Sequence, residues 1–128
     1  MPRTFQISDT HMAAFSAQQR ERFVREMMVY LKEVYPDETK KLGDAKLREL
    51  VETGIDKSKG YNIVLERDVA RYIEFMIAIA PNFDDSKETP WAKPILSERR
   101  STAPSKLDRI ADRHIFSDPK LNPTGKPT

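Results

Sequence analysis

Hydrophobic positions are densest in residues 64–80. Apolar side chains recur there at helical spacing, and in the second half they fill the remaining faces as well: Val69, Tyr72, Ile73, Phe75, Met76, Ile77, Ala78, Ile79 and Ala80. This pattern predicts a helix that is surrounded by protein and stopped by Pro81. The charged residues at its start leave too little uninterrupted apolar length for a membrane span. We therefore expect this helix at the centre of a helical bundle.

A long amphipathic segment precedes the central helix and predicts a first helix that ends at Val34, before Pro36. Ser8 or Asp9 is of the residue type that caps a helix N-terminus. The positions expected to be buried on this helix are Met12, Phe15, Phe23, Met27, Leu31 and Val34.

A second amphipathic segment, capped by Asp44, predicts a helix whose apolar face carries Leu47, Leu50, Val51 and Ile55. Gly54 lies on the same face, where either close approach by the central helix or a kink would account for a glycine. Gly60 stands where a left-handed residue commonly ends a helix.

Two shorter helices are predicted after the central one. Thr89 and Pro90 fit the cap and first position of a helix that ends near Ser97, and a last helix begins near Ala103 or Pro104. Residues 63–65 form the only β-like stretch, and three residues without a partner cannot make a sheet. The predicted fold is all-α: a compact bundle of four to five helices around the central helix, as one domain over residues 1–116, with a disordered tail over 117–128.

Composition narrows the functional classes. The chain has 128 residues, 38% of them hydrophobic and 33% charged, which suits one small helical domain with a large solvated surface. It has no cysteine, which excludes disulfides, thiolate metal sites and a cysteine nucleophile. The first residues lack the apolar run of a secretory signal, so we expect a cytoplasmic protein.

The sequence offers little for catalysis or cofactor binding. Its four glycines are not clustered, which argues against a phosphate-binding loop. His11 and His114 fall in different predicted helices without metal-ligand spacing. Asp84 and Asp85 are adjacent in a polar loop, where both would be hydrated and neither would have the raised pKa of a general acid. We therefore expect no enzymatic activity, no cofactor and no metal site.

Charge is distributed unevenly along the chain. Residues 86–128 carry nine Lys and Arg against five Asp and Glu, although acidic residues such as Glu98 interrupt the basic ones and predict ordinary surface pairs. Arg99 and Arg100 near Trp91 could hold a single nucleic-acid strand by charge and stacking. A small nucleic-acid-binding protein is thus one alternative.

Protein binding is favoured by the aromatic residues that lie in or beside loops around the central helix. Tyr61, Phe83 and Trp91, with Arg99 and Arg100, are of the types that dominate interface energetics and are the candidate partner-binding residues. The alternative interpretation is that the three aromatics are lids on the bundle core.

Several short segments resemble a group of small, all-helical, largely uncharacterised bacterial proteins encoded in type VI secretion and related toxin or injection-system loci. These segments are Phe23-Val24, Val34-Tyr35-Pro36, Gly54-Ile55, Tyr61, the run from Glu66 to Tyr72, the run from Pro81 to Asp84, and Pro90-Trp91-Ala92, within residues 5–115. The resemblance implies an accessory role: an adaptor or chaperone for a secreted effector or spike component, or an immunity protein that neutralises a toxin. We therefore expect a non-enzymatic protein-binding accessory factor.

Overall fold

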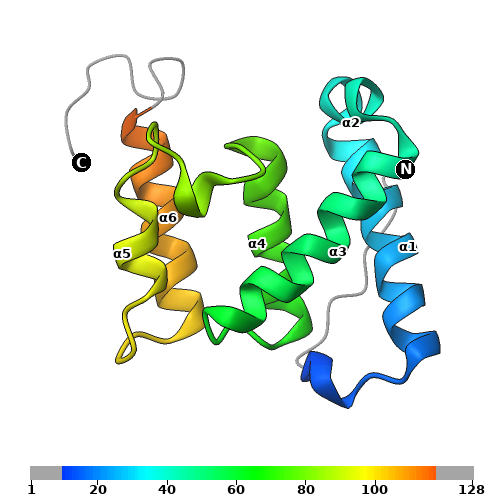
Figure 1. The fold of residues 1–128 in the computed structure, drawn as a ribbon, viewed down its shortest axis with the longest axis horizontal. Helices are drawn as coiled ribbons and strands as arrows, with labels where there is room; N and C mark the ends of the chain where they lie inside the picture. The colour runs from blue at the N-terminus through cyan, green and yellow to red at the C-terminus, as the bar shows by residue number, and fades with distance from the viewer. Residues whose placement is uncertain (1–9, 118–128) are drawn as a thin grey trace. The chain divides into compact units, whose positions relative to one another are not determined.

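The computed structural model describes residues 10–117, and within this range it contains six α-helices, two 3₁₀ helices and no β-strand. The elements are η1 (Met12–Ala14), α1 (Ala17–Val34), α2 (Pro36–Leu42), α3 (Asp44–Gly60), α4 (Glu66–Ala78), η2 (Phe83–Asp85), α5 (Ala92–Leu96) and α6 (Ala103–Ser117) (Figure 1). The predicted all-α fold is confirmed.

Internal contacts divide the chain into two units, one up to Pro81 and one from Asn82 onward, and each is described by itself. The single domain over 1–116 stays a prediction. The last helix extends to Ser117, where the predicted tail begins, and the rest of that tail lies outside the described residues. Within the described part, no helix combines the length and apolar character needed to cross a membrane.

The predicted central helix is α4, and one of its faces is buried. Val69, Tyr72, Ile73 and Met76 are almost completely inaccessible to solvent. Other apolar residues in the second half of α4 are more exposed than the pattern predicted. Ile77 is only half-buried, and Ala78 is exposed. Burial therefore does not extend around the whole circumference of the helix.

Gly54 allows α3 and α4 to come unusually close. A β-carbon at this position would lie 2.5 Å from Cγ1 of Ile73 and 3.0 Å from Sδ of Met76. The first distance is shorter than atoms can approach without displacement. The predicted close approach by the central helix is confirmed, and it explains a glycine inside a helix.

α1 begins later than predicted. Ser16 is its N-cap, and the Ser16 side chain and the Gln19 side chain each accept a hydrogen bond from the other residue's backbone N–H, forming a capping box. The chain before Ser16 forms η1, which His11 caps. The prediction of one continuous helix from Ser8 or Asp9 is therefore wrong, since a complete capping box starts the helix at Ala17.

The buried stripe of α1 consists of Phe23, Val24, Met27 and Leu31. Val34 was predicted to belong to it but is 46% exposed, because it is the last residue of the helix. Met12 and Phe15, now outside the helix, are half-buried.

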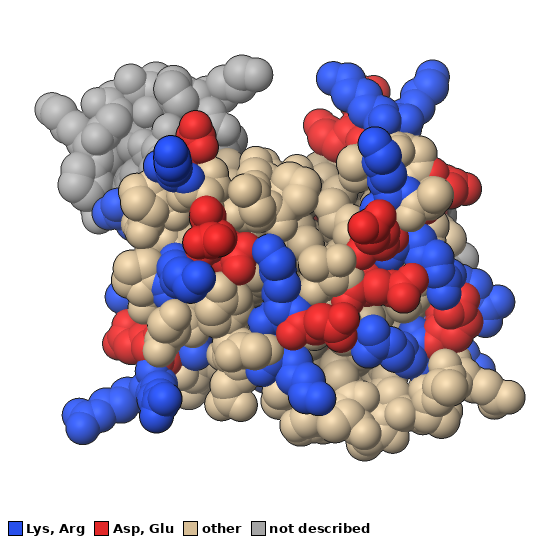
Figure 2. Space-filling model, in the orientation of Figure 1, with Lys and Arg blue, Asp and Glu red and all other residues tan. Residues whose placement is uncertain are grey.

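α1 and α3 run antiparallel, and ion pairs join their exposed edges (Figure 1). Arg20 pairs with Asp56 at 3.6 Å, Lys32 with Asp44 at 2.7 Å, and Glu21 with Arg48. The last pair is bidentate, since both guanidinium NH groups of Arg48 donate to the Glu21 carboxylate. Figure 2 shows the resulting surface, on which acidic and basic side chains alternate over these helices.

Between residues 10 and 117, left-handed backbone occurs at two connections. Gly43, between α2 and α3, has φ 80° and ψ 161°, a conformation open essentially to glycine. After α3, the residue with positive φ is Asn62 (61°), and Gly60 is the last residue of the helix. The prediction for Gly60 is thus wrong by two positions, because asparagine also tolerates this region.

The second unit consists of η2, α5 and α6, with α5 packed against the other two elements. Its buried apolar side chains are Phe83, Ala92, Ile95, Leu96, Leu107 and Ile110. Thr102 accepts a hydrogen bond from the Ser105 N–H, which confirms the predicted start of the last helix. Thr89 does not cap α5 as predicted: its hydroxyl donates to the Phe83 carbonyl at 2.6 Å, and the helix starts at Ala92.

Candidate functional site

The segment that enters η1 is held against the start of α4. The Met12 N–H donates to the Val64 carbonyl at 2.8 Å, and the Glu66 N–H donates to the Thr10 carbonyl at 2.9 Å. These bonds form an isolated antiparallel bridge between His11 and Leu65. The β-like stretch at 63–65 therefore has a pairing partner, although the paired segment is too short to be a strand. The pairing places η1 beside the α3–α4 connection.

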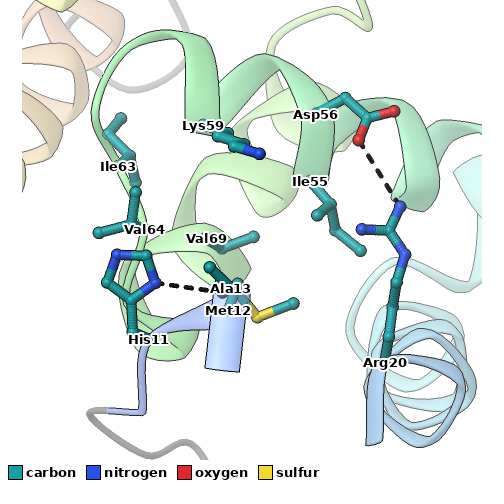
Figure 3. A pocket seen from close by; sticks show the side chains of 10 residues that line it. All are labelled: His11, Met12, Ala13, Arg20, Ile55, Asp56, Lys59, Ile63, Val64 and Val69. Atoms are coloured by element: carbon teal, nitrogen blue, oxygen red, sulfur yellow. Dashed lines mark hydrogen bonds and ion pairs between the residues drawn. The ribbon is translucent and has the colours of Figure 1, made fainter. Parts of the chain in front are cut away.

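A pocket of about 110 Å³ opens where this segment, α3 and the start of α4 meet (Figure 3). Ile55, Ile63 and Val69 line it, and each of these side chains is at most 4% exposed. Met12 and Val64, both half-buried, add apolar surface. The pocket thus has an apolar lining that belongs to the core of the first unit.

Charged and polar groups border the same pocket. Arg20 and Asp56 form the ion pair described above, with side chains 42% and 76% exposed. Lys59 is exposed, and within residues 10–117 its ammonium group makes no ion pair. Figure 3 shows these groups on the α1 and α3 side, and His11 on the η1 side.

His11 is fixed by its own backbone. Its Nδ1 accepts a hydrogen bond from the Ala13 N–H at 3.1 Å. An accepting Nδ1 carries no proton, so in the neutral ring the proton is on Nε2, which is then a donor. His11 is exposed and therefore offers that donor to a group arriving from solvent.

The volume of the pocket limits what it can hold. Sites for small molecules and cofactors usually measure about 300–1,000 Å³, whereas an apolar cavity of about 150 Å³ holds a benzene molecule. At about 110 Å³, this pocket matches a single aliphatic side chain. Its chemistry is that of an anchor site: apolar inside, charged at the border.

Two other hollows do not combine an apolar interior with a charged border. One of about 220 Å³ is bordered mainly by polar side chains, Gln19, Arg22 and Glu26 among them. One of about 350 Å³ lies beside the Lys32–Asp44 pair at the α2–α3 turn. Both are wider and more open than the pocket of Figure 3.

A polar cluster links α1 and the residue after it to α4. The hydroxyls of Tyr30 and Tyr35 donate to the Glu74 carboxylate, at 3.3 Å and 3.1 Å. Burial, together with the nearby negative charge of Glu74, raises the pKa of both tyrosines. The two hydroxyls therefore stay protonated at neutral pH and tie the helices together.

The sequence-predicted partner-binding residues lie outside the pocket. Tyr61 is half-buried with its ring centroid 6.2 Å from that of Tyr72, in the first unit. Phe83 is fully buried, as the core-lid alternative expected. Trp91 is half-buried, and the Arg113 guanidinium lies over its ring at 5.8 Å. Arg99 and Arg100 are exposed.

Several charges of the second unit are engaged with one another. Arg109 pairs with Glu98, the predicted kind of surface pair, and Lys93 lies 3.6 Å from Asp85. The Glu98 carboxyl has a lowered pKa, chiefly through its hydrogen bond from Arg109. Lys106 is 4% exposed, and burial lowers the pKa of its amine. Across residues 10–117, no three His, Cys, Asp or Glu side chains are grouped to hold a metal ion.

Comparisons with protein-family models, with curated proteins and with solved structures give no match to this chain.

The residues that line the pocket were not among the candidates from the sequence. From the sequence, Ile55 and Val69 were interpreted as residues of apolar helix faces, and His11 as a residue of a predicted helix. The one available signal was the β-like run at 63–65, which had no visible partner in the sequence.

Proposed function

We propose that this protein is a non-enzymatic accessory factor that binds another protein, and that the pocket of Figure 3 receives an apolar side chain of that partner. The observation that carries the proposal is the combination of an apolar lining, a volume of about 110 Å³ and a charged border. Residues that dominate protein interfaces fill such pockets, surrounded by polar groups that exclude water.

The expected energetic contribution is that of one anchor residue. Burying a Leu or Ile side chain contributes about 1.5–3 kcal/mol, which is roughly a 10- to 150-fold change in Kd. A stable complex buries about 800 Å² on each partner, so the pocket would be the centre of a larger contact. The surfaces around η1 and α3 would supply the rest of this buried area.

The biological setting of the partner rests on the sequence resemblance alone. On that basis we propose a secreted effector or a spike component of a type VI secretion system as the partner, with the present protein acting as adaptor or chaperone. An immunity protein is the alternative within the same class. An immunity protein would inhibit its toxin stoichiometrically, whereas an adaptor would stabilise or load its cargo and leave the cargo's activity intact.

The test uses a variant that blocks the opening of the pocket. Ala13 lines the pocket and is itself exposed, so Ala13→Trp blocks the opening without removing a core side chain. Ala45→Trp is the matched control, because Ala45 is exposed on α3 and does not line the pocket. Circular dichroism and thermal unfolding would establish that both variants fold.

Proteins that co-purify with the native chain would be identified, produced separately and titrated by calorimetry. We expect Ala13→Trp to weaken binding at least tenfold and Ala45→Trp to change it less than twofold. If no partner of the native chain is lost on Ala13→Trp, the proposal is wrong.

A small nucleic-acid-binding protein remains the alternative from another class, because Arg99 and Arg100 are exposed. Binding to a labelled random-sequence oligonucleotide at low and moderate salt distinguishes the two. We expect no binding even at low salt.

A further inference from the structure

We infer that the segment bound in this pocket carries an acidic residue close to its aliphatic anchor. This inference rests on the proposed function and specifies the chemistry of the partner. It follows from two groups that border the pocket, Lys59 and His11, which can both donate hydrogen bonds to an incoming chain.

The first donor is Lys59. It lines the pocket from α3, is exposed, and makes no ion pair within the described part of the chain. Other charges that face the opening are the Arg20 guanidinium and the Asp56 carboxylate, which pair with each other at 3.6 Å. The border therefore carries one uncompensated positive charge, and a segment with a neighbouring Lys or Arg would meet repulsion there.

The second donor is His11. Its Nδ1 is occupied as an acceptor by the Ala13 N–H, so the neutral ring presents only the Nε2 proton to solvent. Lys59 and His11 thus both favour a hydrogen-bond acceptor on the incoming segment, and a carboxylate also complements the charge of Lys59.

Selection of peptides from a random display library on the full chain tests the inference. We expect enriched sequences to share Leu, Ile or Met with Asp or Glu within about three positions. Selection on Lys59→Glu should keep the aliphatic residue and exchange the acidic bias for Lys or Arg. Lys46→Glu is the matched control, because Lys46 is exposed on α3 and does not line the pocket.

A peptide selected on the native chain would then be synthesised and titrated. We expect Lys59→Glu to weaken its binding about fivefold at low salt, less at high salt, and Lys46→Glu to leave it unchanged within twofold. Ala13→Trp should weaken binding at least tenfold, because the larger side chain blocks the opening of the pocket.

The possible failures are distinguishable. Aliphatic peptides without an acidic bias, still lost on Ala13→Trp, would overturn this inference and leave the proposed function standing. Absence of any peptide that depends on Ala13 would overturn both. A concentration-dependent dimer in sedimentation that Ala13→Trp dissociates would show that a second copy of the chain occupies the pocket, and would also overturn the inference.

Discussion

α3 is held by α4 and by α1 in different ways. Against α4 the contact is apolar and depends on Gly54, where no β-carbon fits without displacing Ile73. Against α1 the exposed edge is joined by ion pairs such as Glu21–Arg48. Close-packed contacts tolerate almost no change of volume, whereas exposed ion pairs contribute little and are screened by salt. We therefore expect the close α3–α4 contact to respond more strongly to substitution than the ion pairs between α1 and α3 do.

The largest effect should follow from Gly54→Ala. Alanine is normally the better helix former, but here its methyl group would push against Ile73 and Met76. We expect a net loss of about 1–3 kcal/mol in the free energy of unfolding, measured by urea denaturation.

Gly60→Ala is the matched control for this substitution. Gly60 is also helical, but a β-carbon there would have nothing within 4 Å. We expect it to be neutral or to stabilise by up to about 1 kcal/mol. If both glycines respond alike, close approach at Gly54 does not limit the α3–α4 contact.

An intermediate effect is expected from Tyr35→Phe, which removes one of the two hydroxyls that bind Glu74. The group is partly exposed, so we expect a loss of about 0.5–1 kcal/mol at neutral pH. The measurement is chemical denaturation of the native chain and the variant in the same buffer.

The pH dependence of this contribution has a definite sign. Burial raises the pKa of Tyr35 above its ordinary value of 10 in the folded state. The contribution is therefore fully present below pH 10 and declines as the pH rises above that value toward the folded pKa. A difference between native chain and Tyr35→Phe that grows with alkalinity would contradict this assignment.

The smallest effect is expected from Glu21→Gln, which breaks the bidentate pair with Arg48. The hydrogen bond from Arg48 is the main reason that the pKa of Glu21 lies below its ordinary value of 4.5. A lowered pKa means that stabilisation is present above pH 4.5 and is lost as the pH falls through the folded value. The difference in urea midpoint should be small at neutral pH, shrink with added salt and vanish in acid.

Glu49→Gln is the control for Glu21→Gln, because Glu49 is exposed on the same helix pair and makes no ion pair within the described residues. We expect no salt-dependent change from it. If Glu21→Gln proves as damaging as Gly54→Ala, the contrast between the two sides of α3 is wrong.

The helices themselves were largely predictable, and the errors lie at their ends. The start of the last helix and the role of Gly54 followed from signals a few residues long. The start of α1 did not, because Ser8, Asp9 and Ser16 are all of the capping type, and the sequence alone did not show that Ser16 caps α1 through its capping box with Gln19. In the same way, Gly60 and Asn62 are both of types that adopt left-handed backbone, and the sequence did not show that Asn62 would do so after α3.

Helical periodicity and a glycine on an apolar face are local properties, so the sequence was enough to predict the all-α class, the buried faces of α1 and α3, and Gly54 as a special position on α3. The pairing of residues 10–12 with residues 64–66, and the hydrogen bonds from Tyr30 and Tyr35 to Glu74, could not be predicted in this way. These residues are far apart along the chain and come together only once the helices have packed. The pocket also forms between segments that are distant along the chain, so the candidate site depends on the fold and not on any sequence motif.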